Sequence, residues 1–179
     1  MKKIILLTLL FLSFTIFAQK RKNFPHKVYL ENLKGDKVSS TTLYNFNKPI
    51  IIDFWASYCK PCIQKFELYK KVYHDWKEKY GVKIIIVSID ERKYQKDARK
   101  LIENRKLPFE VYFDPKKELL KKLSDHKTVP QSFIFDDNFN ITKHMFGGVH
   151  YLYKNNELSN PFLNPKYEEI LKKIVNIKD

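Results

Sequence analysis

The sequence predicts an α/β domain whose central sheet is partly parallel and partly antiparallel. Apolar strand patterns alternate with amphipathic helix patterns through the middle of the chain, and two further strand patterns separated by a short polar turn follow them. The alternation favours parallel strands joined by helices, whereas the short turn favours an antiparallel hairpin. The 179 residues suffice for one such domain with short appendages, and 44% hydrophobic residues supply its core.

The N-terminal residues have the pattern of an export signal. Two lysines precede an apolar run over residues 4–17, and the small residue Ala18 follows the run. The run is shorter than the roughly 20 residues of a membrane-spanning helix and suits a secretory signal peptide, with an uncleaved membrane anchor as the alternative. We therefore predict export to an oxidising extracytoplasmic space such as the periplasm. The predicted divisions are a signal peptide at 1–18, a flexible lead-in at 19–27 and a folded domain at 28–179.

The predicted elements begin with a short hairpin, since apolar positions within residues 28–33 precede a turn signal at Gly35. Residues 50–55 are nearly all apolar, which is typical of a strand buried on both faces. Residues 62–80 repeat apolar side chains every three or four positions, and this pattern predicts a helix with one buried face. Gly81 is expected to end that helix.

The second half continues the alternation and then changes to a hairpin. The two last strand patterns flank a polar turn, which indicates antiparallel pairing. The predicted elements are a strand at 82–89, a helix at 94–107, a strand at 111–113, a helix at 116–123 with Pro115 in its first turn, strands at 132–135 and 141–146, and a helix at 165–177.

The two cysteines of the chain, Cys59 and Cys62, lie where the buried strand gives way to the first long helix, in the segment W-A-S-Y-C-K-P-C. Unpaired backbone N–H groups and the helix dipole favour an anion at a helix N-terminus. The thiolate of Cys59 is therefore stabilised, and it is the thiolate that acts as a nucleophile. Lys60 adds a nearby positive charge with the same effect. The pattern predicts dithiol redox chemistry.

Two other interpretations of the cysteine pair are weaker. A purely structural disulfide would close a loop of about four residues, which removes only about 2 kcal/mol of unfolded-chain entropy. A metal site would need further ligands, and the five histidines show no paired spacing. We therefore expect a redox role and no metal.

The segment W-A-x-x-C-x-P-C after a hydrophobic strand resembles the active-site motif of the thioredoxin superfamily. The export signal, the N-terminal hairpin and the extra strand–helix unit within residues 82–114 are similar to those of the TlpA/ResA-type extracytoplasmic thiol-disulfide oxidoreductases, and the resemblance covers residues 28–173. It implies a thioredoxin-like fold with Cys59 as the attacking cysteine and Cys62 as the resolving cysteine, joined by a disulfide when oxidised. It implies no cofactor.

The resemblance also implies roles for residues around the cysteines. Pro130 matches the cis-proline that packs beside the cysteines in this superfamily. Val129, which precedes it, is a candidate to pair with the backbone of a substrate. Trp55 and Tyr58 are candidates to wall the sulfur site and contact substrate.

Asp53 is a carboxylate inside an apolar strand, and such a group is costly to bury unless it is paired or protonated. It lies six residues before Cys59, and its position is similar to that of the buried acid of thioredoxins. This resemblance implies that Asp53 is a general acid or base for Cys62. Many members of the extracytoplasmic branch carry a glutamate three residues after the second cysteine, where this chain has Lys65. We therefore expect Asp53 to carry the acid–base task alone.

These features predict an enzyme that exchanges its disulfide with partner proteins, acting as a reductant, for example in cytochrome c maturation or disulfide repair. A membrane or periplasmic protein would supply its electrons. A thiol peroxidase of the peroxiredoxin type and a non-catalytic peptide-binding module are the alternatives.

The formal net charge of +14 becomes +12 without the two signal-peptide lysines. The charge is spread among acids along the helices, which predicts a solvated surface with weak attraction to anionic membranes and no nucleic-acid site.

Overall fold

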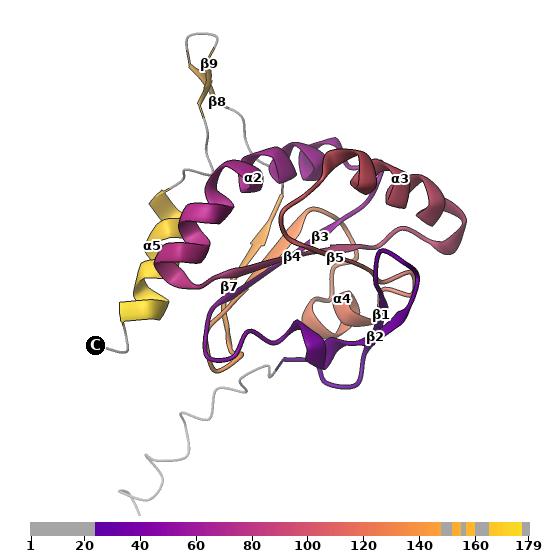
Figure 1. Cartoon of the computed structure of the whole chain (residues 1–179), viewed down its shortest axis with the longest axis horizontal. Helices are drawn as coiled ribbons and strands as arrows, with labels where there is room; N and C mark the ends of the chain where they lie inside the picture. Colours follow the sequence, from indigo (N-terminus) through magenta and orange to yellow (C-terminus); the bar gives the residue numbers. More distant parts are fainter. Residues whose placement is uncertain (1–23, 148–151, 155–156, 160–164, 177–179) are drawn as a thin grey trace, which may run out of the picture.

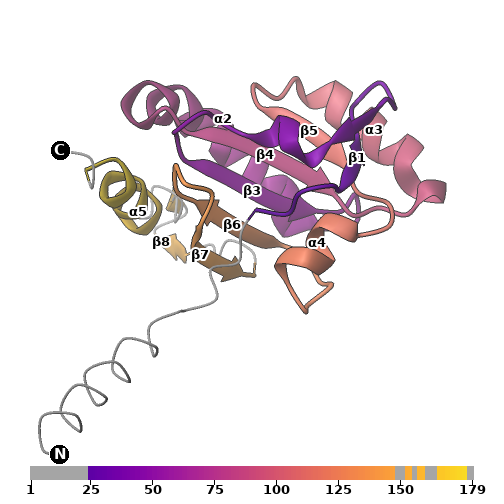
Figure 2. The same cartoon turned by 90° about the horizontal axis from the view of Figure 1, so that it is seen from below.

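Seven strands form one mixed sheet in the computed structural model, which describes residues 24–147, 152–154, 157–159 and 165–176. The strand order is β2-β1-β5-β4-β3-β6-β7, and β3 to β6 lie side by side in Figure 2. The sheet strands are β1 (Tyr29–Glu31), β2 (Lys37–Ser39), β3 (Ile50–Trp55), β4 (Lys83–Ser88), β5 (Glu110–Phe113), β6 (Gln131–Phe135) and β7 (Ile141–Phe146). The helices are α2 (Lys60–Tyr80), α3 (Gln95–Arg105), α4 (Glu118–Leu123) and α5 (Pro165–Asn176), with short 3-10 turns η1 (Ser40–Leu43) and η2 (Arg92–Tyr94).

The sheet is parallel in part and antiparallel in part, as the sequence predicts. β3 pairs in parallel with β4, and β4 with β5, whereas β6 runs antiparallel to both β3 and β7. All six residues of β3 are buried, because helices cover both faces of the sheet at its centre. The predicted N-terminal hairpin is formed by β1 and β2, and β1 joins the sheet beside β5.

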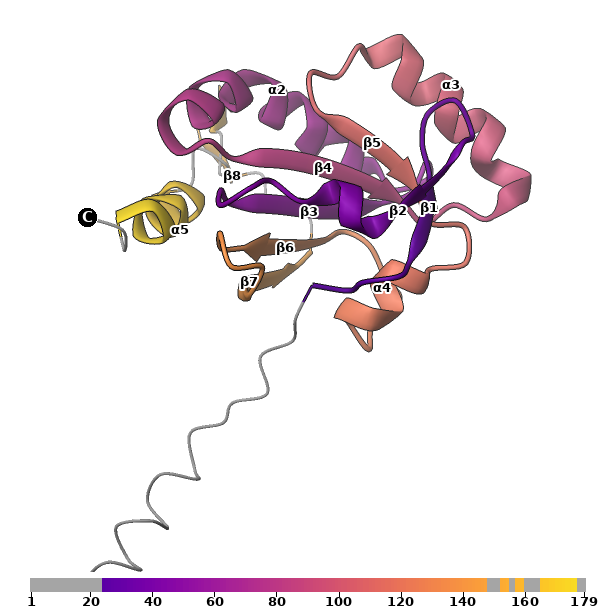
Figure 3. The ribbon, with the colours of Figure 1, turned by 60° about the horizontal axis from the view of Figure 1, so that its bottom comes forward.

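Helices cover the two faces of the sheet unequally. Figures 1 and 3 show α2 and α3 on one face and α4 on the opposite face. Helix α5 packs against α2, where the rings of Trp76 and Tyr167 stack with centroids 5.9 Å apart. Gly81 ends α2 in the left-handed conformation, and its N–H group donates to the carbonyl of Lys77. The helix pattern predicted from the sequence is therefore confirmed, with its first turn extended back to Lys60.

Two details differ from the sequence-based prediction. Helix α4 begins at Glu118, so Pro115 precedes the helix and the prediction that it occupies the first turn was wrong. The reason is Asp114, whose carboxylate accepts hydrogen bonds from the N–H groups of Glu118, Leu119 and Leu120 at 2.7–3.2 Å and so sets the start of the helix. A second, separate ladder of β8 (Leu152–Lys154) and β9 (Glu157–Ser159) was not predicted.

The predicted signal peptide and lead-in lie outside the described residues, apart from residues 24–27. Among the helices that the structure describes, none is both long enough and apolar enough to cross a membrane.

One end of the sheet brings together three segments that are distant in sequence. Phe54 of β3 pairs with Gln131 of β6, and Gln131 in turn pairs with Phe146 of β7. Because β6 is antiparallel to its two neighbours, the end of β3, the start of β6 and the end of β7 lie at the same edge. The cysteine segment after Trp55 and the loop before Gln131 therefore emerge next to each other.

Candidate active site

The cysteine pair lies at the N-terminus of α2 and forms a disulfide in this structure. Cys59 is the residue that caps the helix, and the N–H group of Cys62 donates to its sulfur at 3.3 Å. Cys59 is 6% exposed and Cys62 is fully buried. The geometry thus leaves Cys59 as the sulfur that a partner can reach, and it places a hydrogen-bond donor where the Cys59 thiolate would form.

The loop before β6 contains the proline that the resemblance singled out. The Val129–Pro130 peptide bond is cis. Pro130 is buried and Val129 is half-buried, and the carbonyl of Pro130 accepts a hydrogen bond from the N–H group of Gly147 at 3.0 Å. The strand register described above places this loop at the same sheet edge as the cysteine segment.

The two predicted aromatic residues lie in different environments. Trp55 is fully buried, and its ring packs edge-on against Phe66 with centroids 5.2 Å apart. Tyr58, directly before Cys59, is 72% exposed. Tyr58 is therefore available to a partner, whereas Trp55 supports the site from inside the core.

Asp53 lies on β3 and is completely buried, but it is not isolated. The ammonium group of Lys65 forms an ion pair with Asp53 Oδ2, and it also donates to the hydroxyl of Ser132. Two hydroxyl groups donate to the same carboxylate oxygen, Tyr69 at 2.8 Å and Ser132 at 3.0 Å. The other oxygen, Oδ1, has no partner among the described residues.

This contact corrects the sequence-based interpretation of Lys65. From the sequence, Lys65 indicates only that a glutamate is absent at this position, and Asp53 is predicted to act alone. Lys65 follows Cys62 by three residues, so both side chains lie on the inward face of α2, and Lys65 is 1% exposed. The buried acid is therefore one half of an ion pair.

The charge states of this cluster follow from its burial and its pairing. Burial by itself lowers the pKa of Lys65, but the nearby Asp53 and Tyr167 outweigh it, and the pKa of Lys65 is raised above its usual value. Burial, together with Asp53, raises the pKa of Tyr69 well above its usual value. Near neutral pH Lys65 is therefore charged, and Tyr69 is a neutral hydroxyl that donates to the carboxylate.

Asp90, which the sequence analysis missed, holds the segment before the cysteines. It follows β4 and is 2% exposed. Its carboxylate accepts hydrogen bonds from the backbone N–H group of Ser57 at 2.9 Å, from the Ser57 hydroxyl at 2.8 Å and from the Ser88 hydroxyl at 2.8 Å. Ser57 lies two residues before Cys59. The sequence does place a carboxylate directly after a predicted parallel strand. Ligands bind at the carboxyl ends of such strands in α/β sheets, so this position was a signal for a site residue.

We predict that Asp90→Asn lowers the free energy of unfolding by about 1–3 kcal/mol, because an amide cannot accept all three hydrogen bonds and leaves a buried donor unpaired. Urea unfolding of the oxidised protein measures this change. Asp75→Asn on the exposed side of α2 is the matched control, with an expected change within about 0.5 kcal/mol. Equal stability of the two variants would contradict the role given to Asp90.

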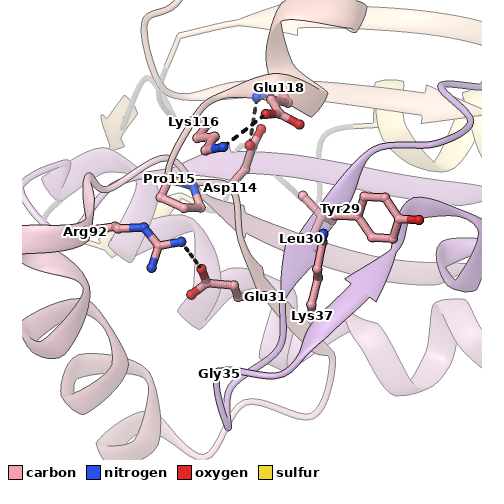
Figure 4. Close-up of a pocket in the computed structure, with 10 residues that line it drawn as sticks. All are labelled: Tyr29, Leu30, Glu31, Gly35, Lys37, Arg92, Asp114, Pro115, Lys116 and Glu118. Atoms are coloured by element: carbon pink, nitrogen blue, oxygen red, sulfur yellow. Dashed lines mark hydrogen bonds and ion pairs between the residues drawn. The ribbon is translucent and has the colours of Figure 1, made fainter.

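No metal site is evident among the described residues. Within the described ranges, no three His, Cys, Asp or Glu side chains gather to hold a metal ion. A pocket of about 580 Å³ lies between the hairpin and the start of α4, as Figure 4 shows, and none of its lining residues is a predicted site residue. Its charged groups are largely paired, Arg92 with Glu31 at 3.2 Å and Lys116 with Glu118 at 4.0 Å.

The fold and the site together define a thioredoxin-like protein with a paired-cysteine redox centre. The chain belongs to the AhpC/TSA family, whose model matches residues 19–144. This family assignment agrees with the thioredoxin-like resemblance of the sequence motif.

Named relatives and solved structures agree with this class. The chain is 26% identical over 130 residues to sporulation thiol-disulfide oxidoreductase A of Bacillus subtilis, covering 72% of this chain and 76% of that one. It is 27% identical over 116 residues to the thiol-disulfide oxidoreductase ResA of Bacillus cereus, covering 65% of this chain and 64%, just under two thirds, of ResA.

A thioredoxin-like protein from Porphyromonas gingivalis superimposes with a TM-score of 0.66 at 28% identity, covering 86% of this chain and 92% of that one. StoA from Bacillus subtilis gives a TM-score of 0.54 at 25% identity, covering 68% and 88%. The chain is thus a thiol-disulfide oxidoreductase of the ResA and StoA type.

Proposed function

We propose that this protein is an exported reductant that opens disulfides in partner proteins through Cys59. The observation that carries the proposal is the asymmetry of the two cysteines at the start of α2, where Cys59 keeps 6% of its surface exposed and Cys62 is fully buried. The neighbouring cis-proline loop supports it, because this loop and the cysteine segment share one edge of the sheet.

The proposed reaction has two exchange steps. The Cys59 thiolate attacks one sulfur of the partner's disulfide, so a mixed disulfide forms and the partner's other sulfur leaves as a thiolate. The Cys62 thiol then loses its proton and attacks the sulfur of Cys59, which releases the partner's second thiolate and forms the Cys59–Cys62 disulfide. Two electrons pass to the partner. A membrane or periplasmic donor then reduces the pair again.

The residues around the cysteines have distinct proposed roles in this reaction. Asp53, which is paired with Lys65, accepts the proton of the Cys62 thiol. Val129 and Pro130 present the loop to the substrate backbone, and Tyr58 contacts the substrate from its exposed position. Trp55 supports the site through the core. None of these steps needs a cofactor.

The location and the domain limits belong to the same proposal. Removal of residues 1–18 as a signal peptide would leave a lead-in at 19–27 and a thioredoxin-like domain at 28–179 in an extracytoplasmic space. Such a space permits both disulfides in partners and a disulfide in this protein. Reduction of oxidised cysteines during cytochrome c maturation or disulfide repair is the proposed task.

Mixed-disulfide trapping tests the proposed function. We expect Cys62→Ser, expressed with its signal in the native cell, to accumulate covalent adducts with extracytoplasmic proteins, because the resolving thiol is missing. Non-reducing gels followed by mass spectrometry identify the adducts, which must disappear on reduction. The Cys59→Ser/Cys62→Ser variant is the control. Absence of adducts, with Cys59 shown to react with a small disulfide, would contradict a protein substrate.

A further inference from the structure

The side chain of Gln131 is the link between the cis-proline loop and the sheet. Gln131 is the first residue of β6 and is fully buried. Its amide nitrogen donates to the backbone carbonyl of His126 at 3.0 Å and also to that of Thr128. Both carbonyls belong to the loop that precedes Pro130. One buried amide therefore holds the backbone of the loop at two points before the cis peptide bond.

His144 on the neighbouring strand sets the orientation of that amide. Its Nε2 atom lies 3.0 Å from Gln131 Oε1. Since the amide nitrogen of Gln131 is engaged with two carbonyls, its oxygen must accept, and His144 Nε2 must carry the hydrogen. The imidazole itself is held between two rings, stacked on Phe133 with centroids 4.0 Å apart and tilted against Phe146 at 4.1 Å.

The loop needs such an anchor because most of it is exposed. Residues 125–128 are exposed and Val129 is only half-buried, so packing does little to fix their conformation. Hydrogen bonds to backbone carbonyls are directional and fix the path of the chain. The edge-on contact of His126 with Phe146, at 5.0 Å between centroids, places His144, Phe146 and the loop in one continuous cluster.

We propose that Gln131 and His144 form a positioning pair that holds the backbone around Val129 in the conformation that binds a protein substrate. The inference rests on the proposed function, because it assigns to the loop the recognition of a partner's backbone. The pair does not touch the reacting sulfurs in this proposal. Its effect is therefore on the binding of an extended protein substrate and not on the intrinsic reactivity of Cys59.

Two substrates of different size separate these effects. Insulin offers a protein disulfide with backbone on both sides, whereas 5,5'-dithiobis(2-nitrobenzoic acid) is a small disulfide that has no backbone to pair. For His144→Phe, which keeps an aromatic ring on Phe133 and removes the donor, we expect the KM for insulin to rise about five- to tenfold, since the buried oxygen of Gln131 loses its hydrogen-bond donor. The rate with the small disulfide should stay within about twofold of wild type.

The conservative variant His144→Gln retains an N–H donor and should restore the KM for insulin to within about threefold of wild type. Equal KM values for wild type and His144→Phe would overturn the proposal. An equal loss on both substrates would overturn it as well, because a general structural defect slows both reactions.

A spectroscopic test is independent of activity. The nitrogen shifts of His144, measured by long-range ¹H–¹⁵N correlation near pH 8, should show the Nε2-protonated ring, and Gln131→Met should shift the amide signals of residues 126–129. An Nδ1-protonated ring would overturn the pair. If the wild-type protein reacts with the small disulfide and fails on insulin and other protein disulfides, the proposed function fails, and this measurement still decides whether the pair fixes the loop.

Discussion

Cys59→Ser is expected to lower the rate of insulin reduction by more than about 10³-fold, since removal of a catalytic nucleophile costs factors of this order or larger. A serine hydroxyl at the N-terminus of α2 does not ionise near neutral pH and forms no mixed disulfide. Turbidity of reduced insulin in the presence of dithiothreitol, corrected for the rate without enzyme, measures the loss.

The neighbouring exposed residue supplies the control for this variant. Tyr58→Phe changes the side chain directly before Cys59, and we expect it to retain at least about a third of the wild-type rate because it leaves both sulfurs unchanged. Cys59→Ser should also unfold cooperatively, which shows that the loss is chemical. More than about one tenth of the wild-type rate in Cys59→Ser would contradict the assignment of Cys59 as the attacking sulfur.

Lys65→Met is expected to lower the free energy of unfolding by about 3–5 kcal/mol, the usual cost of removing one partner from a buried ion pair. Asp53 is fully buried, and without the ammonium group the hydroxyl groups of Tyr69 and Ser132 are the remaining hydrogen-bond donors to its carboxylate among the described residues. Urea unfolding of the oxidised protein at pH 7 measures the change. Lys71→Met, at an exposed position of the same helix, is the matched control.

The double variant Asp53→Asn/Lys65→Met tests whether the effect belongs to the pair. We expect it to recover more than half of the stability lost in Lys65→Met, since it contains no unpaired buried charge. A double variant that is less stable than Lys65→Met by the full cost of Asp53→Asn would show that the two groups do not interact.

The same pair has a signature at alkaline pH. The pKa of Lys65 is raised in the folded protein, so the stability it contributes is complete below the unfolded pKa of about 10.4 and is lost as the pH rises through the folded pKa. The raised pKa of Tyr69 acts in the same direction above about pH 10. We therefore expect the free energy of unfolding to fall above about pH 10, and to fall less steeply in the double variant.

The pair also bears on the proposed role of Asp53 in proton transfer. The Lys65 ammonium lies against Asp53 Oδ2, so the proposed proton transfer from Cys62 would take place beside a fixed positive charge. In this chain residue 65, three positions after Cys62, thus supplies a cation. The acid and its partner form a buried ion pair, which explains how a lysine is tolerated in the core.

Local sequence patterns were sufficient for most of the fold. The run at 50–55 matches the bounds of β3, because a strand buried on both faces is apolar at nearly every position, here all but Asp53. The run does not specify which strands lie on either side of it. Gly81 ends α2 as expected, since few other residues adopt its left-handed conformation at low cost. The start of α4 was misplaced because Asp114, outside the helix, caps it with its side chain.

By itself, the sequence determined the class of fold, the position of the cysteine pair at a helix start and the identity of the proline loop, because each depends on residues close together in the chain. Only the tertiary structure decided which groups surround them. Lys65 meets Asp53 because α2 packs on β3, Asp90 reaches Ser57 because β4 lies beside β3, and His144 reaches Gln131 because β7 lies beside β6. Such contacts join residues 12 or more positions apart, and their partners are selected by packing geometry, which periodicity and spacing do not specify.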